Sequence, residues 1–405
     1  MTRRSPTRRR APSRQIGAAL LLSCLALPAG ASAPSLALTL EPEETILFRH
    51  ASDACETWDI PDTPTRAFRG ADGLVHVMQT HFRGRWLAGE DLFSLRHGCD
   101  VAFEGADSAD PATFDNRSWI GATFSPDGRE VFALVHNEYH GERFGGPCPA
   151  ADNSPCWYNT LTGAVSGQVG APFEPTEPRL IAAIPFRADE TQGHHAGYFE
   201  PTNIVRWQGA FFAMANVVSP APQRNGNCLL RTEELADPAS WRVWRNGAFE
   251  TRLADPYAGP IDRQQHLCDP VAPEALRWPV TSLTRHEASG TWIATMRGRA
   301  KDAGGTERTG VYYATSSDLL EWQGPALLME APLFGACAPE RPIGYPALID
   351  PASTDRNFTT VGARAALTFV RGEAKGCQIG PERDIVLRPV RIEPVTSARE
   401  RRSSR

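Results

Sequence analysis

The 405-residue sequence predicts an all-β protein, and more specifically a five-bladed β-propeller. Three observations support this prediction. Helical patterns are rare after the first 33 residues, where short apolar or alternating stretches are separated by glycine, proline and aspartate. A unit of two apolar strands joined by a turn recurs five times. Its copies lie roughly 55 to 80 residues apart, a period that suits propeller blades.

Each copy of the unit is predicted to be a β-hairpin. Glycine in a turn supplies the positive φ that a tight hairpin needs. The five copies span residues 66–80, 118–138, 201–217, 280–298 and 345–372. Their turns fall at Asp72-Gly73, Asp127-Gly128, Gln208-Gly209, Ser289-Gly290 and near Asp355. A further strand with a tryptophan-containing turn follows in some copies, most clearly at 229–244 and 311–322. A two-sheet sandwich is the alternative architecture, but it explains the recurrence less well.

The first 33 residues are typical of a secretory signal peptide. Six arginines precede an apolar run and then the small residues Ala31-Ser32-Ala33. Cleavage is expected after Ala31 or Ala33, which predicts a secreted or periplasmic protein. Leu21-Leu22-Ser23-Cys24 loosely resembles a lipobox, so lipid anchoring at Cys24 is the minor alternative. We expect the propeller to occupy residues 34–392 and a disordered basic tail to occupy residues 393–405.

The charge of the chain argues against nucleic acid as a partner. The net charge is −5 for the full sequence and about −11 without the arginines of the leader, which is the wrong sign for a polyanion. Outside the leader, no segment is long and apolar enough to span a bilayer. The oligomeric state is left open by the sequence.

Eight cysteines lie outside the leader, and an even number in an exported protein indicates disulfides. Cys148 and Cys156 are close enough to close a small loop. The other pairings cannot be deduced from the sequence, although proximity favours Cys228 with Cys268 and Cys337 with Cys377. No CxxC pair suggests zinc.

Three stretches carry a resemblance to five-bladed propeller glycoside hydrolases of the arabinanase and β-xylosidase type. ATSSDLLEW (314–322) resembles a turn that these enzymes repeat between outer strands. EPTNIVRWQGAFFAM (200–214) and DTPTRAFRGADGLVHV (62–77) are similar to segments in which an acidic residue precedes an innermost strand. The resemblance implies a carbohydrate as substrate or ligand.

The resemblance also implies roles for particular carboxyl groups. A family aspartate in the first blade acts as general base and a glutamate in a later blade as general acid, which correspond here to Asp62 and Glu200. A second family aspartate, which adjusts the pKa of the acid, has no clean match, and Asp115 or Asp269 are the substitutes. An inverting hydrolase needs such a pair roughly 6.5–9.5 Å apart, with room for a water.

The stretch VHNEYHG (135–141) is a further candidate for the site. It follows the turn at Asp127-Gly128, so it is predicted to be a strand whose side chains alternate between two faces. His136, Glu138 and His140 then share one face, while Tyr139 lies on the other. Glu138 is the favoured site carboxylate, oriented by a histidine or by Tyr139.

A shared metal is a less favoured interpretation of the same stretch. Four residues of strand separate the two histidines by about 13 Å, which is wide for one ion. No cofactor is therefore predicted. A divalent metal held by His136, Glu138 and His266 is kept as an alternative, in which the protein hydrolyses a different bond.

Other polar and aromatic residues are candidates for substrate binding. His195 precedes Glu200 in a glycine-flanked loop, and His266 and Asp269 flank Cys268. Trp119, with Trp86 and Trp157, is a candidate platform for sugar stacking. The predicted function is a glycoside hydrolase-like protein, and the alternative is a propeller that binds a glycan or another protein without catalysis.

Overall fold

The computed structural model describes residues 1, 34–79, 81–145, 157–191, 195–335, 337 and 341–395. The chain divides into two units, Met1–Gly30 and Ala31–Arg405. The predicted signal peptide, both of its cleavage positions and Cys24 lie outside the described residues. Every described strand belongs to the second unit.

The second unit is all-β, as predicted. Its strands form four sheets that contain five consecutive antiparallel groups, because the second and third groups share one sheet. The first group holds β3 (Arg66–Arg69), β4 (Val75–Met78), β5 (Arg83–Gly89) and β6 (Arg96–Glu104). The second holds β7 (Arg117–Phe124), β8 (Val131–His140), β9 (Trp157–Ser166) and β10 (Glu174–Ala182). The third holds β12 (Val205–Trp207), β13 (Ala210–Val218), β14 (Gly226–Thr232), β15 (Arg242–Arg245) and β16 (Ala248–Thr251).

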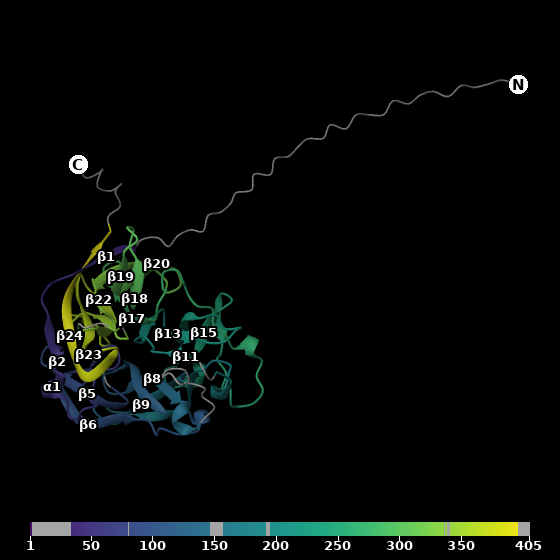
Figure 1. Ribbon diagram of the computed structural model, residues 1–405, viewed down its shortest axis with the longest axis horizontal. Coiled ribbons are helices and arrows are strands. Elements are labelled where there is room, and N and C mark those ends of the chain that lie inside the picture. The colour runs from purple at the N-terminus through teal and green to yellow at the C-terminus, as the bar shows by residue number, and fades with distance from the viewer. Residues whose placement is uncertain are drawn as a thin grey trace. The chain divides into compact units, whose positions relative to one another are not determined.

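The fourth and fifth groups repeat the pattern. The fourth holds β17 (Val280–His286), β18 (Trp292–Lys301), β19 (Glu307–Ser316) and β20 (Trp322–Glu330). The fifth holds β21 (Ile343–Ile349), β23 (Arg364–Lys375), β24 (Gln378–Pro394) and the N-terminal strand β1 (Leu36–Leu40). In Figure 1 the colours advance from group to group around a common centre, which is the arrangement of a five-bladed β-propeller.

Short elements connect these groups. Strand β11 (Ala196–Phe199) pairs with β9 and β13 and so joins the second group to the third. Strand β2 (Thr45–Phe48) pairs with β24, and β22 (Thr360–Val361) pairs with β17. The helical segments are α1 (His50–Asp53) and the 3-10 turns η1 (Pro111–Thr113), η2 (Gly141–Phe144), η3 (Ala188–Thr191), η4 (Pro238–Ser240) and η5 (Arg263–Gln265). Among the described residues, no helix is long and apolar enough to cross a membrane.

The five predicted hairpins are present as the pairs β3–β4, β7–β8, β12–β13, β17–β18 and β21–β23. In the first four hairpins the turn glycines have φ of +84°, +83°, +83° and +69°. A side chain at such a φ would be strained, so these glycines explain why the turns fall where the sequence predicts them.

Apolar side chains fill the space between neighbouring groups. Ile120 lies in one buried cluster with Phe68 of the first group, and Trp292 lies in another with Met214 of the third. The fifth group and the first share a cluster as well, to which Leu387 and Val77 belong. Each fully buried side chain of this size contributes about 1.5–3 kcal/mol. The groups are therefore held by apolar contacts with both neighbours rather than by hydrogen bonds alone.

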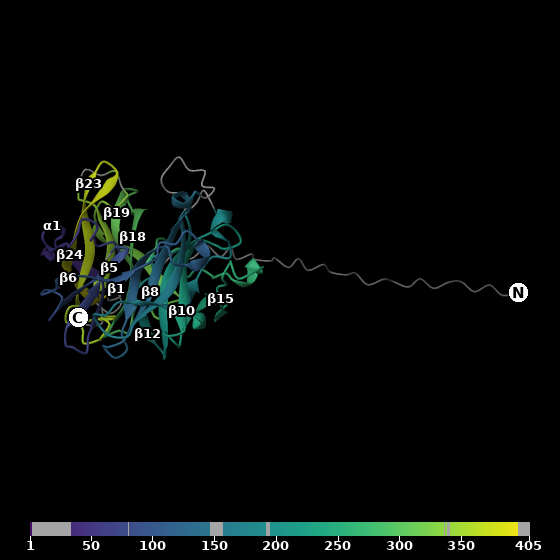
Figure 2. The same cartoon turned by 90° about the horizontal axis from the view of Figure 1, so that it is seen from below.

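The N-terminal and C-terminal strands lie side by side. Strand β1 pairs with β24 along its whole length, from Leu36 opposite Pro394 to Leu40 opposite Val390. Figures 1 and 2 show β1 next to β24. Strand β24 thus continues two residues past the predicted end of the propeller at 392. The rest of the predicted tail, from residue 396 onward, lies outside the described residues.

A single arginine ties the inner strands together. Arg66 of β3 is buried, and its guanidinium donates to the carbonyl oxygens of Gly121 at 2.8 Å, Pro201 at 2.9 Å and Thr281 at 2.9 Å. These acceptors belong to the second, third and fourth groups. Burial, opposed by the carboxylate of Glu200, lowers the pKa of Arg66 to about 9, so the side chain is still charged at neutral pH.

Three disulfides lie within the described residues. The two pairs favoured by proximity, Cys228–Cys268 and Cys337–Cys377, are present. Cys55 pairs with Cys99. The predicted pair of Cys148 with Cys156 lies outside the described residues.

Candidate active site

A pocket of about 490 Å³ is lined by all five groups of strands or by the segments that lead into them. Its wall includes Asp62, Trp119, Glu200, Arg297 and Tyr345, one residue from each group in chain order. In a propeller the innermost strands converge, so residues far apart in the sequence meet there. A smaller cavity beside the pocket shares several of its residues.

Asp62 lies just ahead of the first inner strand. It accepts a hydrogen bond of 3.0 Å from the hydroxyl of Tyr345 and another from Arg383, both on Oδ1. Its other oxygen lies 3.6 Å from Nε2 of His81. Burial, followed by the charges of Asp62 and Glu200, raises the pKa of Tyr345 well above its usual value. The tyrosine therefore keeps its proton and acts as the donor.

Glu200 precedes the inner strand of the third group. Its Oε1 lies 3.4 Å from Nη2 of Arg297, and its Oε2 is buried without a hydrogen-bond partner among the described residues. Burial tends to lower the pKa of Arg297, but Glu200 and Tyr345 outweigh it and the pKa is raised. Arg297 thus stays charged, while Oε2 of Glu200 is left free for a ligand.

Two non-glycine residues of the pocket have positive φ, namely Glu200 at +24° and Tyr345 at +54°. Such backbone conformations cost of order 1–3 kcal/mol each and gather at functional sites. Both residues belong to segments that place a polar side chain in the pocket. The strain is consistent with a site selected for its geometry rather than for stability.

Strand β8 carries a chain of three polar side chains along its pocket face. Nε2 of His140 lies 2.9 Å from Oε2 of Glu138, and Nε2 of His136 lies 3.5 Å from Oε1. Burial opposes the charge of Glu138, but the hydrogen bond from His140 and the proximity of His136 outweigh it, so the pKa of Glu138 is lowered. The carboxylate of Glu138 thus lies between the two histidines and contacts both.

His136 also connects Glu138 to Glu200. The backbone N–H of Glu200 donates to Nδ1 of His136 at 3.3 Å. Nε2 of the same ring faces Glu138 and also contacts the side-chain amide of Asn159. The imidazole of His136 therefore links the carboxylate of Glu138 to the backbone, not the carboxylate, of Glu200.

Two further histidines line the pocket. His81 contacts the ring of Trp119 edge to face, with 5.5 Å between ring centroids, and the ring centroids of His195 and Trp157 lie 4.3 Å apart. Burial lowers the pKa of both histidines, so both are neutral at pH 7. Their rings and the two tryptophans form the apolar part of the wall, which suits the C–H face of a sugar.

Several residues proposed from the sequence lie elsewhere. Tyr139 points to the opposite face of β8, as strand alternation requires, and stacks on Phe144 in the core. His266 contacts the carbonyl oxygen of Arg252 at 2.8 Å, outside the pocket. The proposed set of His136, Glu138 and His266 is therefore not brought together.

The two aspartates considered as substitutes for a third acid also lie outside the pocket. Asp269 accepts from the backbone of Asn246 at 2.8 Å and pairs with Arg224, and Asp115 pairs with Arg179 at 2.9 Å. Trp86 packs in the core against Phe173. The residues that do meet in the pocket are Asp62, Trp119, His136, Glu138, His140, Trp157, His195 and Glu200.

Sequence reasoning missed five polar residues of the pocket: His81, Arg117, Asn216, Arg297 and Tyr345. A signal was present for Arg117, which lies two positions before Trp119 and therefore on the same face of its strand. Tyr345 stands at the start of the fifth repeated unit, where the first and third units have Asp62 and Glu200 nearby. Arg297 lies far along β18, and its position in the sequence carries no such signal.

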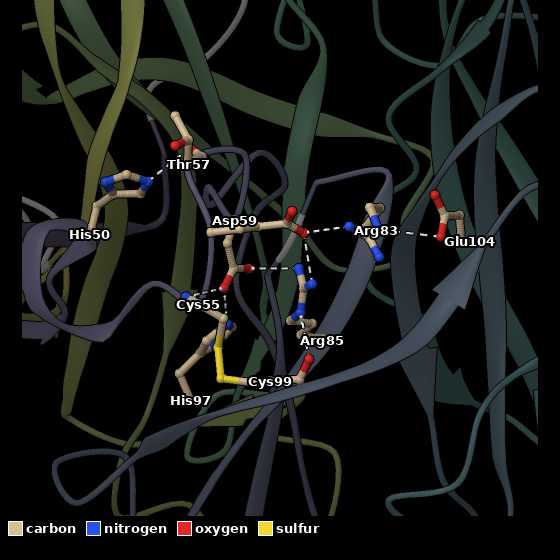
Figure 3. A network of polar contacts seen from close by, with 10 residues as sticks. His50, Cys55, Thr57, Asp59, Arg83, Arg85, His97, Cys99 and Glu104 are labelled. Atoms are coloured by element: carbon tan, nitrogen blue, oxygen red, sulfur yellow. Dashed lines mark hydrogen bonds and ion pairs between the residues drawn. A yellow bond between two sulfur atoms is a disulfide. The ribbon is translucent and has the colours of Figure 1, made fainter.

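A second buried polar cluster lies outside the pocket and is shown in Figure 3. Oδ2 of Asp59 lies 2.5 Å from Nε2 of His97 and accepts from the backbone of Cys55, while Oδ1 lies 3.5 Å from Arg85. Burial opposes the charge of Asp59, but the hydrogen bond from His97 outweighs it and the pKa is lowered.

This cluster has the residue types of a metal site but not the chemistry. Potential ligand atoms of Cys55, Asp59 and His97 lie within 4.8 Å of one another. The sulfur of Cys55, however, is bonded to Cys99, and metals require a thiolate. The cluster instead anchors the segment between α1 and β3 to strand β6.

No family model matches the sequence, and no curated protein matches it. The chain is similar to an α-L-arabinanase from Cellvibrio cellulosa solved with arabinohexaose, with 10% identity, a TM-score of 0.42 and coverage of 82% of this chain and 91% of the other. It is similar to the catalytic domain of an α-L-arabinofuranosidase from Coprinopsis cinerea, with 10% identity, a TM-score of 0.43 and coverage of 89% and 98%. A GH43_1 enzyme from Xanthomonas citri complexed with xylotriose gives 12% identity, a TM-score of 0.43 and coverage of 88% and 91%. These proteins belong to the group of propeller glycoside hydrolases that the sequence motifs resemble.

Proposed function

We propose that this protein is a glycoside hydrolase that cleaves an O-glycosyl bond in its central pocket. The observation that carries the proposal is the meeting of Asp62, Glu138 and Glu200, from three successive groups of strands, in one pocket with two tryptophans. Glycosidic cleavage needs one carboxyl group that donates a proton and one that activates a water.

The surroundings of the three carboxyl groups suggest their roles. Glu200 has one oxygen free, on which a proton can be held and passed to the leaving oxygen. Asp62 is the candidate base. It accepts a hydrogen bond from the hydroxyl of Tyr345, which fixes the orientation of the carboxyl group. Glu138, kept ionised by His140, adds negative charge near the reacting centre, where an oxocarbenium-like transition state becomes positive.

A panel of aryl glycosides and polysaccharides incubated with the purified protein tests the proposal. We expect hydrolysis of at least one substrate, and a loss of about 10²–10⁴-fold in kcat for Glu200→Gln, the range for removal of a general acid. Glu274→Gln is the matched control, because that side chain is 82% exposed and lies outside the pocket. Unchanged activity in Glu200→Gln contradicts the assignment of the acid.

The alternative is a propeller that binds a glycan without cleaving it. One observation favours it, namely that Arg383 and Tyr345 already engage Oδ1 of Asp62, which leaves less of this carboxylate for a water. Calorimetric binding of an oligosaccharide that is never hydrolysed, by the wild type and Glu200→Gln alike, supports this second function. The protein is expected to act outside the cytoplasm, in keeping with its disulfides.

A further inference from the structure

Arg117 is a cation in the wall of the pocket that the proposed catalytic roles do not use. It begins strand β7, is half-buried and pairs through its backbone with Glu138 of β8. It lies on the same strand face as Trp119, so both side chains line the pocket. Its guanidinium lies over the ring of Phe82, with Cζ 5.1 Å from the ring centroid. The aromatic face holds the planar group in position.

The other charged groups of the pocket are already paired. Asp62 is engaged by Arg383, Glu200 by Arg297, and Glu138 by His140. Among the described residues, no carboxylate forms an ion pair with Arg117, and no carbonyl oxygen accepts a hydrogen bond from it. Within the described part of the pocket wall, the guanidinium of Arg117 therefore has no ion-pair or hydrogen-bond partner.

The acidic neighbours of Arg117 are engaged by other groups, and Glu138, opposite it on β8, is held by His140. Arg117 also affects His81, whose pKa is lowered by burial first and by Arg117 among the smaller causes. Asp107, which also senses Arg117, is held by two hydrogen bonds from Arg143. Because His81 is neutral and Asp107 is already paired with Arg143, the N–H donors of Arg117 remain available to an anion from solution.

We propose that Arg117 binds the carboxylate of a uronic acid residue, so that the substrate is an acidic rather than a neutral glycan. The proposal rests on the proposed function, since it names the substrate class of the same pocket. Arginine presents a rigid fork of N–H donors that matches a carboxylate in two-point contact. The tryptophans of the wall take the apolar face of the sugar, while Arg117 recognises its acid group and excludes the neutral sugar of the same shape.

Paired substrates test the inference. Both anomers of 4-nitrophenyl glucuronide and galacturonide are compared with the matching glucoside and galactoside, for the wild type and for Arg117→Gln. We expect the wild type to prefer a uronide. Arg117→Gln raises the KM for that uronide about tenfold or more, as expected for the loss of a charge-assisted hydrogen bond, and leaves the neutral substrate within about twofold.

Two variants serve as controls. Arg206→Gln removes a guanidinium that also lies over a phenylalanine, with Cζ 5.7 Å from the ring centroid of Phe211, but outside the pocket, and it should leave both KM values unchanged. Arg117→Lys keeps the charge and should restore part of the preference. An equal rise in KM for acidic and neutral substrates in Arg117→Gln overturns the inference, because it indicates a structural role.

The inference can fail separately from the proposed function. Hydrolysis that depends on Glu200 but favours neutral glycosides keeps the function and overturns the uronate assignment. Stronger action on a sulfated galactan than on a polyuronate also overturns it. If nothing is hydrolysed, calorimetry with trigalacturonate and with xylotriose still tests it. Binding of the acidic trisaccharide alone, weakened in Arg117→Gln, then supports a uronate site in a protein without catalysis.

Discussion

The guanidinium of Arg66 donates a 2.9 Å hydrogen bond to the carbonyl oxygen of Pro201, the residue that follows Glu200. The same side chain reaches the carbonyl oxygens of Gly121 and Thr281. One side chain of the first group thus supports the backbone beneath the proposed acid and the inner strands on either side of it. The backbone next to Glu200 and the joining of the inner strands therefore depend on the same side chain.

Arg66→Met should destabilise the fold strongly. The change leaves three buried carbonyl oxygens without a donor, and each unsatisfied group costs about 1–3 kcal/mol. We expect the free energy of unfolding, measured in urea, to fall by about 3 kcal/mol or more. Arg206→Met, on an exposed side chain, should change it by less than about 0.5 kcal/mol. Equal effects in the two variants contradict the supporting role of Arg66.

Asp62→Asn should reduce catalysis without preventing binding. The amide keeps the size of the side chain and can still accept from Tyr345, but it cannot activate a water. We expect kcat to fall about 10²–10⁴-fold and KM to change little. An inverting mechanism also requires that the first product released has the opposite anomeric configuration, which ¹H NMR detects during the reaction. A retained configuration contradicts the role of Asp62 as base.

Glu138 should stabilise the protein only while it is ionised. Its pKa is lowered in the folded state from a usual value of 4.5, so its contribution is present above pH 4.5 and disappears as the pH falls through the folded value. Thermal unfolding of the wild type and of Glu138→Gln at pH 7, 5 and 3 measures this. The difference in Tm should shrink on acidification. For Glu274→Gln we expect no difference at any pH, and a constant difference for Glu138→Gln contradicts the prediction.

The disulfide between Cys228 and Cys268 should contribute to stability by restricting the unfolded chain. The two residues are 40 positions apart, and a loop of this size corresponds to about 3–4 kcal/mol. We expect Cys228→Ala with Cys268→Ala to lower the Tm by several degrees. Reduction with dithiothreitol should lower the Tm of the wild type more than that of the double variant. A double variant as stable as the wild type contradicts the prediction.

Much of the fold could be predicted from local patterns. Turn glycines such as Gly73 and Gly128, with positive φ, mark hairpins whatever their surroundings. Strand alternation placed His136, Glu138 and His140 together, and the structure shows them in contact. The same rule places Tyr139 on the other face, where it packs in the core, so it does not orient Glu138 as the sequence analysis allowed.

The rest of the site depends on contacts between distant segments. Arg297 reaches Glu200, and Tyr345 reaches Asp62, only because inner strands of different groups converge. No local pattern determines how far along a strand a side chain meets the pocket. Nor could local patterns show on which side of the third group the loop of His266 lies.

The pairing of β1 with β24 bears on how the chain folds. Strand β1 is made first, yet the partner that covers its edge is made last. During synthesis the earliest strand therefore has an open edge, and its apolar residues Leu36 and Leu38 await a cluster that forms only with the fifth group. A propeller assembled in this order is complete only when its final strand arrives. A chain that stops shortly before residue 378 lacks β24, and both β1 and β2 are then without the strand with which they pair.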